Sequence, residues 1–333
     1  MLQPSSGDTF QIVSGSSVKR HEVLWLEDGN VILQAEDVQF RVHRSMLVRH
    51  SPIFRDMFSI PQPQNPQDSD PDGCPVIVLS DSADDVGQVL AIFYDNYRFL
   101  DLREKLSIGA IAAMLRMGKK YDIAYLRDDA LKRLRHDFPI TLPDWEASYN
   151  GSSPIDYTTL SDYAKTVAAI ISLGREHDIQ SILPGAFLHY TNRATLEEIL
   201  AEDNNNLPQE ACTQCVIGRD KFLRRVHSTL LSWFRLPTFM PISTCSNIAV
   251  CPLKKQALFR GLCDSLWMGE GGKVRWDFTD CIPGRAAKTI KILCPSCATS
   301  ISRCYRDSRN KLWEELPSFF GLLGWDQLRD FDQ

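Results

Sequence analysis

Near its start the chain alternates apolar and polar residues with the two-residue period of a β-strand. Val38, Phe40 and Val42 are apolar and the residues between them are polar, which predicts a half-buried strand. Strand-forming residues also dominate 23–26 and 31–33, on either side of the turn-forming sequence "EDGN". That arrangement predicts that these two runs pair as a β-hairpin.

After residue 43 the apolar spacing changes to that of α-helices. Short helices are predicted at 44–50 and 52–59, with Pro52 in the first turn of the second, where a missing N–H is tolerated. A short apolar run at 76–79 predicts a buried strand. Apolar residues then recur at three- and four-residue intervals, which predicts three amphipathic helices; the stripes lie at 86–93, 108–115 and 126–134. These signals indicate an α+β domain, a small sheet capped by a helical bundle.

The run "FPITLPDWEASYNGSSP" at 138–154 breaks this periodicity with proline, glycine and serine, and it predicts a boundary. Beyond it the apolar spacing is helical, and the aromatic tail "KLWEELPSFFGLLGWDQL" is expected to pack on those helices. We therefore expect a flexible arm at 1–20, an α+β domain at 21–138, a linker at 139–157 and a mainly α-helical C-terminal domain at 158–333.

Two histidines, His43 and His50, lie in the segment "FRVHRSMLVRHSPIFRDMF" and raise the alternative of a catalytic pocket. We expect a packed interaction module instead, because burying each large apolar side chain here stabilises the fold by about 1.5–3 kcal/mol. His43 stands at a strand-to-helix junction, where an imidazole can bond to backbone groups left open by the helix. His50 is expected at the surface. The predicted core residues are Phe40, Val42, His43, Leu47, Phe54, Met57 and Phe58.

Motifs of enzyme and cofactor sites are incomplete in this sequence. "DSDPDG" at 68–73 begins like a calcium-binding loop, but its twelfth position is Leu79 rather than a carboxylate. "PGRAAKT" at 283–289 lacks the glycines that let a backbone wrap a phosphate. No spacing points to a catalytic Ser-His-Asp or Cys-His arrangement. The sequence therefore predicts a protein that is not an enzyme.

The net charge of −5 is unevenly distributed. Residues 141–210 hold 3 basic and 11 acidic residues, for −8, whereas residues 211–310 hold 16 basic and 6 acidic ones, for +10. The basic block favours, as an alternative, a zinc-stabilised nucleic-acid-binding or transcription-related function. Its basic residues are dispersed, however, and the acidic block can neutralise them within one folded domain. Nucleic acid is therefore not the expected partner.

Nine of the ten cysteines also fall within 211–310. Cys212 and Cys215 form one CxxC pair, but 78 residues separate it from the next pair, at Cys294, so the spacing does not support a joint zinc site. The sequence around the first pair predicts an amphipathic helix, in which cysteine serves as a small apolar residue.

The second CxxC pair has a different character. Cys294 and Cys297 flank a proline-containing turn that lets two thiolates face one metal ion. Cys245 and Cys251, in a proline-rich stretch, are the better partners for it. Together these four cysteines predict tetrahedral thiolate coordination of a structural zinc that joins two distant segments. Buried free thiols are the alternative.

Other features bear on the compartment. No apolar run approaches the roughly 18 residues that a membrane helix needs, and the start "MLQPSSGDTF" lacks the basic end and apolar stretch of a secretory signal. We therefore expect no membrane association and a cytoplasmic or nuclear protein. In that setting cysteines serve as thiols or metal ligands rather than as disulfides.

The order of these elements, together with two segments, resembles the BTB/POZ domain. "FRVHRSMLVRHSPIFRDMF" is similar to the family pattern F-x-V-H-r-x-x-L-x-x-x-S-x-x-F-x-x-M-F, and "AAMLRMGKKYDIAYLRDDALKRL" to the helix pair that closes the domain. The resemblance covers roughly residues 20–138. It is closest to BTB proteins expanded in mushroom-forming (basidiomycete) fungi, which share "EDGNVILQAE" and a following "PQPQ" loop. Glu22 departs from the aspartate of many BTB domains.

The C-terminal half resembles, more weakly, the region that follows the BTB domain in those fungal proteins. The similarity is carried by "ILPGAFLHYTN", "GRDKFL", "LCPSC" and the aromatic tail. The resemblance implies a protein–protein interaction adaptor whose partners are other proteins. It also implies that the BTB surface forms a homodimer or engages a cullin-type ubiquitin ligase scaffold, while the C-terminal domain recruits a client.

Overall fold

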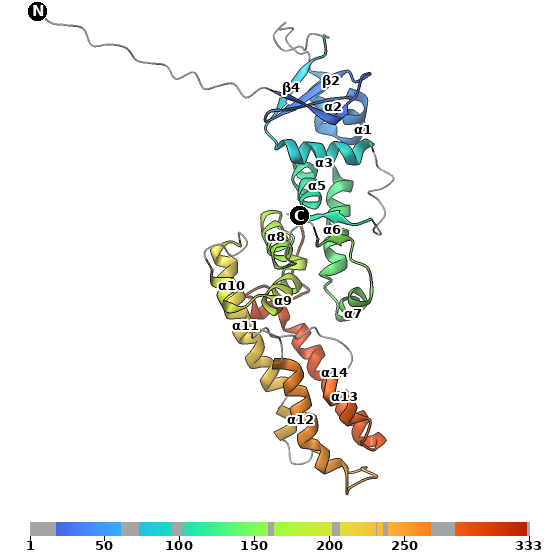
Figure 1. Ribbon diagram of the computed structural model, residues 1–333, viewed down its shortest axis with the longest axis vertical. Coiled ribbons are helices and arrows are strands. Elements are labelled where there is room, and N and C mark those ends of the chain that lie inside the picture. The colour runs from blue at the N-terminus through green and yellow to red at the C-terminus, as the bar shows by residue number, and fades with distance from the viewer. Residues whose placement is uncertain are drawn as a thin grey trace, which may run out of the picture. The chain divides into compact units, whose positions relative to one another are not determined.

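The computed structural model (Figure 1) describes residues 18–60, 73–94, 102, 104–158, 163–201, 207–230, 232–235, 239–267 and 284–331. The chain divides into two units. Unit 1 comprises the residues up to Arg98 together with Arg116–Tyr125, and unit 2 comprises Phe99–Leu115 together with Leu126–Gln333. The division passes through helix α5 (Ile108–Lys120).

Unit 1 is built on a four-stranded sheet in the order β1-β3-β2-β4. Its strands are β1 (Lys19–Trp25), β2 (Val31–Ala35), β3 (Val38–Val42) and β4 (Val76–Leu79). β2 and β3 pair antiparallel, while β1 runs parallel to β3 and β4 parallel to β2. The predicted hairpin between β1 and β2 is therefore wrong, because the hairpin joins β2 to β3.

Local backbone geometry explains the different pairing. The β2–β3 turn has two residues, and the first, Glu36, has a φ of 53°, as tight hairpin turns require. The "EDGN" segment instead crosses to β3, where the Leu26 N–H donates to the Arg41 carbonyl. Gly29 lies against that strand so closely that an added Cβ would be 3.0 Å from the Val42 nitrogen. Only glycine fits there, and the segment cannot act as a simple reversal.

The helices of unit 1 cover this sheet. They are α1 (Arg44–His50), α2 (Pro52–Ser59), α3 (Ala83–Tyr94) and the C-terminal part of α5. Ser51 connects two of them, since its hydroxyl accepts the Phe54 N–H at the start of α2 and donates to the Tyr121 carbonyl after α5. The apolar stripe at Val86–Phe93 is buried; the residues concerned are Val86, Val89, Leu90 and Phe93.

The residues expected in the core occupy two environments. Phe40, Val42, Leu47 and Phe54 are at most 2% exposed. Met57, Phe58 and His43 are half-buried, and the guanidinium of Arg44 lies over the Phe58 ring at 4.9 Å. The second half of α2 therefore lies at the edge of the core rather than inside it.

Unit 2 is mainly helical. Its helices in chain order are α6 (Ala124–Asp137, nearly all of it), α7 (Leu142–Asn150), α8 (Tyr163–Glu176), α9 (Leu183–Arg193), α10 (Leu196–Leu200), α11 (Gln209–Leu230), α12 (Cys251–Trp267), α13 (Gly284–Ile290), α14 (Pro295–Glu314) and α15 (Leu316–Phe319), with 3-10 turns at Gln180–Ile182 and Ser232–Arg235. Short strands β5 (Leu106–Ser107) and β6 (Ile155–Asp156) pair in parallel.

The segment expected as a linker, 139–157, is structured. It contains α7, which Thr141 caps by accepting the Asp144 N–H, and β6. Trp145 of α7 is buried and its ring lies 5.1 Å from that of Trp313. Proline and glycine therefore mark helix ends here, and the large aromatic side chain anchors the segment.

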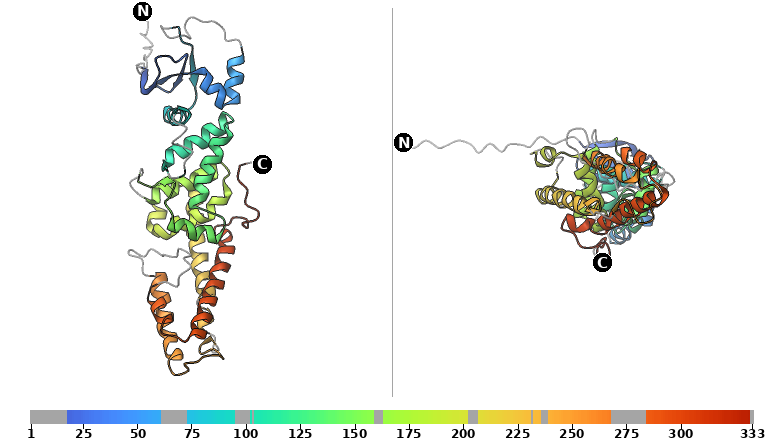
Figure 2. Two further views of the ribbon diagram at one scale, coloured as in Figure 1. Left: turned by 90° about the vertical axis from the view of Figure 1, so that its right-hand side faces the viewer. Right: turned by 90° about the horizontal axis from the view of Figure 1, so that it is seen from below.

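α11 and α14 run side by side through unit 2 (Figures 1 and 2). α15 also packs on α11, where the Phe320 ring lies so close to Gly218 that a Cβ there would be 2.2 Å away. The tail is buried as expected at Trp313, Leu316, Phe319 and Phe320, while Trp325 is half-buried and stacks on Trp313. No helix in the described ranges is long and apolar enough to span a membrane.

Candidate functional site

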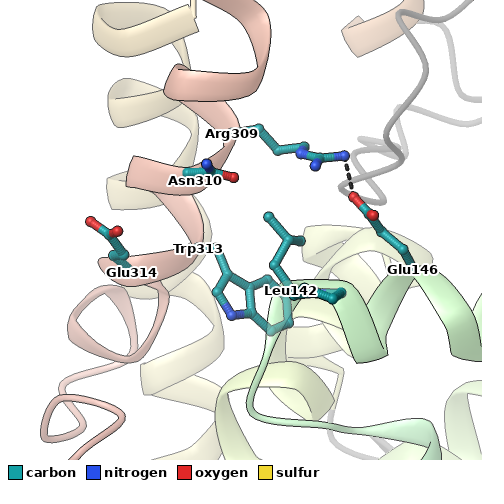
Figure 3. A pocket seen from close by; sticks show the side chains of 7 residues that line it. Leu142, Glu146, Arg309, Asn310, Trp313 and Glu314 are labelled. Carbon is teal, nitrogen blue, oxygen red and sulfur yellow. Dashed lines mark ion pairs between the residues drawn. The ribbon is translucent and has the colours of Figure 1, made fainter.

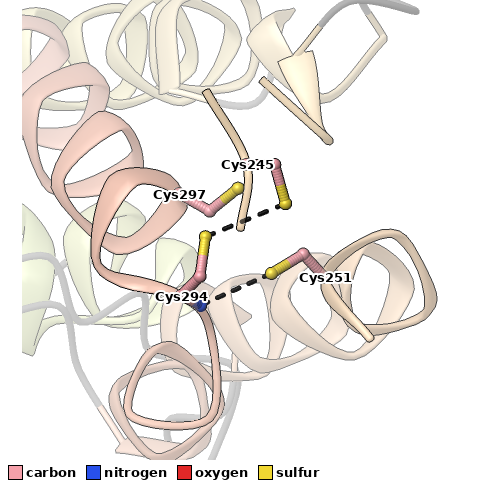
Figure 4. A group of neighbouring side chains, drawn as sticks. All are labelled: Cys245, Cys251, Cys294 and Cys297. Atoms are coloured by element: carbon pink, nitrogen blue, oxygen red, sulfur yellow. Dashed lines mark hydrogen bonds between the residues drawn. The ribbon is translucent and has the colours of Figure 1, made fainter. Parts of the chain in front are cut away.

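Four cysteines converge at the start of two helices in unit 2 (Figure 4). Cys245 lies in the loop before α12, Cys251 is the first residue of α12, and Cys294 and Cys297 lie at the start of α14. Their Sγ atoms all lie within 4.8 Å of one another. Three of the four side chains are buried and Cys245 is half-buried. These are the four residues that the sequence predicts as metal ligands.

Local structure aims these side chains at one point. Cys294 is the N-cap residue of α14 and Pro295 occupies its first position, where proline favours helix initiation. Cys297 follows three residues later and so lies on the same side of the first turn. The Cys294 N–H donates to the Cys251 sulfur at 3.4 Å, which ties the starts of α12 and α14 together.

The spacing and chemistry of these sulfurs fit a zinc ion. Tetrahedral coordination with Zn–S bonds near 2.3 Å places the sulfurs about 3.8 Å apart, and the Cys294 and Cys245 Sγ atoms are 3.8 Å apart. A disulfide would need a separation of about 2 Å. Four thiolates fill a tetrahedral shell and leave no position for a substrate, as in structural rather than catalytic zinc sites.

The four thiols differ in their electrostatic environment. The pKa of Cys294 is lowered to about 5, because its sulfur accepts hydrogen bonds from the backbone N–H of Cys297 and from Ser246. Burial raises the pKa of Cys297 to about 12 and also raises the pKa of Cys251. One ligand is thus favoured as a thiolate, and a divalent cation would compensate for the burial of the others by binding them as thiolates.

The other cysteines lie apart from this cluster. Cys212 and Cys215 are buried on α11, as small apolar residues of an amphipathic helix. Cys263 and Cys304 are half-buried, and Cys281 lies outside the described residues. None of the nine cysteines that the structure describes forms a disulfide.

His43 and His50 are held at opposite ends of α1. The His43 ring contacts the Tyr94 hydroxyl at 3.0 Å and an Asp28 carboxylate oxygen at 3.2 Å, and it makes no capping bond to the backbone. His50, expected at the surface, stacks on Phe93 with ring centroids 4.5 Å apart. Burial lowers the pKa of His50. Each of the two rings packs on an aromatic neighbour.

A pocket of about 300 Å³ lies between α7 and α14 (Figure 3). Arg309 is almost fully buried and forms an ion pair with Glu146 across it. The indole of Trp313 and the side chain of Leu142 form the apolar part of its wall. Two carboxylates, those of Glu146 and Glu314, belong to its lining; the lining residues are Leu142, Pro143, Glu146, Arg309, Asn310, Trp313 and Glu314.

The comparison with known families concerns the region that contains the sheet. Residues 26–137 match the family model of the BTB/POZ domain. These residues form a BTB/POZ domain. The match extends from β2 through α6, so it includes the helix pair that the sequence associates with the end of the domain. The BTB domain is a protein–protein interaction module. No curated protein and no solved structure matches the chain.

Sequence reasoning missed the residues that support the cysteine cluster. Ser246 bonds to the Cys294 sulfur through both its N–H and its hydroxyl, yet nothing in the local pattern distinguishes it from other loop serines. The basic block also forms an ion pair of the kind expected with the acidic block. Arg309 pairs with Glu146 of the acidic block, but the described part of the chain shows no ion pair for Arg260, Lys288 or Lys291.

Proposed function

We propose that this protein is a non-enzymatic adaptor that binds one set of proteins through its BTB domain and another through residues 158–333. The observation that carries the proposal is the BTB/POZ domain at 26–137. The packing of His43 against Tyr94 and of His50 against Phe93 supports it, since these contacts give both rings a structural role.

Within this proposal the BTB domain self-associates or binds a cullin-type scaffold, so that a client bound by residues 158–333 is presented for ubiquitin transfer. Support comes from the two edge strands of the sheet. Val23 on β1 is 77% exposed and Val78 on β4 is 73% exposed. Large apolar side chains on unpaired edges favour contact with another protein.

The proposal extends to the setting of the protein. We place it in the cytosol or nucleus of a mushroom-forming fungus. The nine described cysteines form no disulfide, which favours a reducing compartment. The segment "EDGNVILQAE" supports the fungal origin through its resemblance to the BTB proteins of those organisms.

We also propose that Cys245, Cys251, Cys294 and Cys297 hold a structural zinc. The ion would join the loop before α12 to the starts of α12 and α14, which are 43 residues apart in sequence. Its role is to fix the helices of the cysteine-rich region so that they present a stable surface, because the sulfur spacing leaves no open coordination position.

The adaptor proposal is tested by changing the edge strands in the full-length chain. Val23→Glu combined with Val78→Glu should abolish one subset of co-purifying proteins, measured by quantitative mass spectrometry from the native cell, and retain another. Leu323→Glu, at a 58% exposed residue of the tail, is the matched control and should retain the BTB-dependent subset.

Two measurements on purified protein separate the finer claims. Light scattering at tens of micromolar detects self-association, and mixing with a cullin N-terminal domain detects scaffold binding. A monomer that binds no cullin removes both finer claims and leaves the general one. An edge-strand variant that keeps every partner contradicts the proposal that the BTB domain recruits proteins through these edges.

A further inference from the structure

Three exposed aliphatic residues lie close in sequence to the cysteines of the cluster. Leu253 is 77% exposed and Ile248 is 70% exposed, the highest values among the large apolar residues of unit 2 that the structure describes. Ile292, 56% exposed, lies two residues before Cys294. All three are within three residues of a cluster cysteine, so their backbones lie near the point where the four sulfurs meet. Exposed apolar groups of this kind mark interaction sites more often than isolated ones do.

The same segments are basic. Residues 239–267 and 284–302 contain six basic residues and one acidic residue, Asp264. Arg260, Lys288 and Lys291 are exposed. Arg260 lies seven residues after Leu253 on α12, hence on the same helix face, and α12 packs on α13, which carries Lys288. We call this set the cluster face; it comprises Ile248, Leu253, Arg260, Lys288, Lys291 and Ile292.

We propose that the cluster face docks an acidic protein segment that carries large apolar side chains. Carboxylates of the partner would face Arg260, Lys288 and Lys291, while its apolar side chains would cover Ile248, Leu253 and Ile292. The inference rests on the adaptor proposal, because it assigns the second of the two partner-binding surfaces. It also gives the zinc site a purpose, since the ion fixes the segments that carry the apolar residues.

Charge complementarity and side-chain type together select this partner over a nucleic acid. Phosphate groups would use the basic residues but not three exposed aliphatic ones. Single-stranded nucleic acids stack their bases on aromatic rings, and the exposed apolar residues of the cluster face are leucine and isoleucine. An acidic amphipathic segment uses both kinds of group, and its charge would speed the encounter in a salt-dependent way.

The test uses the zinc-loaded, full-length chain and three fluorescent probes near physiological ionic strength. The first is a short acidic peptide with leucine and phenylalanine at helical spacing, the second replaces those apolar residues by serine, and the third is a short DNA duplex. Fluorescence anisotropy should show at least about tenfold tighter binding of the first probe than of the other two. Raising the salt concentration should weaken that binding.

Variants locate the site. Ile248→Ser with Leu253→Ser should weaken binding of the first probe about tenfold or more, and Lys288→Glu with Lys291→Glu should weaken it and reduce its salt dependence. Leu200→Ser, at a residue 63% exposed at the end of α10, is the matched control and should bind as the unchanged chain does. Zinc content and circular dichroism verify that each variant is folded.

Three outcomes would overturn the inference. They are equal binding of the two peptides, tighter binding of the duplex, and unchanged binding after Ile248→Ser with Leu253→Ser. If that double variant instead loses self-association in light scattering, the face is covered by a second copy of the chain. None of these results affects the edge-strand experiment, so failure here is distinguishable from failure of the adaptor proposal.

Discussion

The BTB domain and the cysteine-rich region of unit 2 are stabilised in different ways. In the BTB domain, β2 and β3 bury Ile32, Leu33, Phe40 and Val42 to 1% exposure or less. In the cysteine-rich region, α12 buries three of its described side chains, those of Cys251, Leu258 and Leu262. With so few buried side chains among residues 251–263, this described part of α12 gains little from apolar burial alone.

This difference separates two kinds of stability. Apolar burial in the BTB domain is distributed over many side chains and needs no ligand. If zinc binds as we propose, the cysteine-rich region depends in addition on four sulfurs, which repel one another as thiolates unless a cation neutralises them. The two regions should therefore respond oppositely to metal removal and to truncation of apolar side chains.

Metal removal should have the largest effect. Chelation, or Cys297→Ser, should eliminate one bound zinc per chain and expose the amides of 239–263 and 284–302 to hydrogen exchange. Structural zinc sites contribute on the order of 10 kcal/mol of apparent binding free energy at neutral pH. Amides of β2 and β3 should keep their protection, because no metal ligand lies in that sheet. Metal analysis and hydrogen exchange measured by mass spectrometry provide the readouts.

Cys304→Ser is the matched control, since Cys304 lies on α14 but outside the cluster. It should leave zinc content and exchange unchanged. Purified protein without stoichiometric zinc, yet fully protected at 284–302, would show that apolar packing alone holds these segments and would remove the contrast between the two regions.

Truncation in the BTB core should have the second largest effect and the opposite distribution. Phe40 is fully buried and contacts the His21 ring at a centroid distance of 5.0 Å. Phe40→Ala should lower the free energy of unfolding of the BTB domain by about 3–5 kcal/mol, through lost burial and a residual cavity. Urea unfolding followed by circular dichroism measures it, and zinc content should stay constant.

Val78→Ala provides the comparison within the same sheet. Val78 is 73% exposed, so its truncation should change the free energy of unfolding by less than about 0.5 kcal/mol. Equal losses for the two variants would mean that the sheet is covered by something other than its own helices.

How far each region could be predicted from sequence follows from the range of its interactions. The strands and helices of the BTB domain could be predicted because their apolar residues recur at regular short intervals along the sequence. The segment "FRVHRSMLVRHSPIFRDMF" then indicated the type of domain. The pairing of β1 with β3 did not follow, because it depends on the close approach of Gly29 to β3. The structure of residues 139–157 could not be predicted for the same reason. It depends on the packing of Trp145 against Trp313, which is 168 positions away in the sequence.

The cysteine cluster illustrates the complementary case. The CxxC spacing of Cys294 and Cys297 identifies them as a candidate ligand pair. Their predicted association with Cys245 and Cys251 was based on residue type and on the proline-rich sequence around those two cysteines, not on geometry. The hydrogen bonds from Ser246 to the Cys294 sulfur could not be predicted, because such bonds leave no recognisable pattern in the sequence. The exposure of Leu253 likewise depends on which face of α12 packs inward.

Acidification should have a smaller effect, confined to unit 2. His189 is buried among Phe138, Trp145 and Tyr163, and the Tyr163 hydroxyl lies 2.8 Å from its Nδ1. Burial, with a contribution from Arg193, lowers the pKa of His189 to about 3. Because this value is below that of the unfolded chain, the stabilisation is complete above about pH 6.5 and is lost as the pH falls towards 3.

The free energy of unfolding of unit 2 should therefore fall by roughly 1.4 kcal/mol for each pH unit below 6. His189→Gln should flatten this dependence between pH 6 and 5, whereas His227→Gln, at an exposed residue of α11, should not. Urea unfolding at several pH values measures both slopes. A slope that survives His189→Gln would assign the acid sensitivity to the cysteine cluster, whose thiolates also bind protons.

Helix caps should give the finest comparison between the two regions. Ser51 is 1% exposed, accepts the Phe54 N–H at 3.1 Å and donates to the Tyr121 carbonyl at 2.7 Å. Thr195 of unit 2 is half-buried and shares a reciprocal capping box with Glu198. Ser51→Ala removes a cap and a buried tertiary bond, so it should cost about 2 kcal/mol, whereas Thr195→Ala removes a cap near solvent and should cost about 1 kcal/mol or less.

Urea unfolding of the two variants measures the difference, and Ser51→Thr should recover part of the first loss because it restores the hydroxyl. Equal losses would mean that the bond to Tyr121 contributes nothing beyond the cap, and that the BTB helices are joined by apolar contact alone.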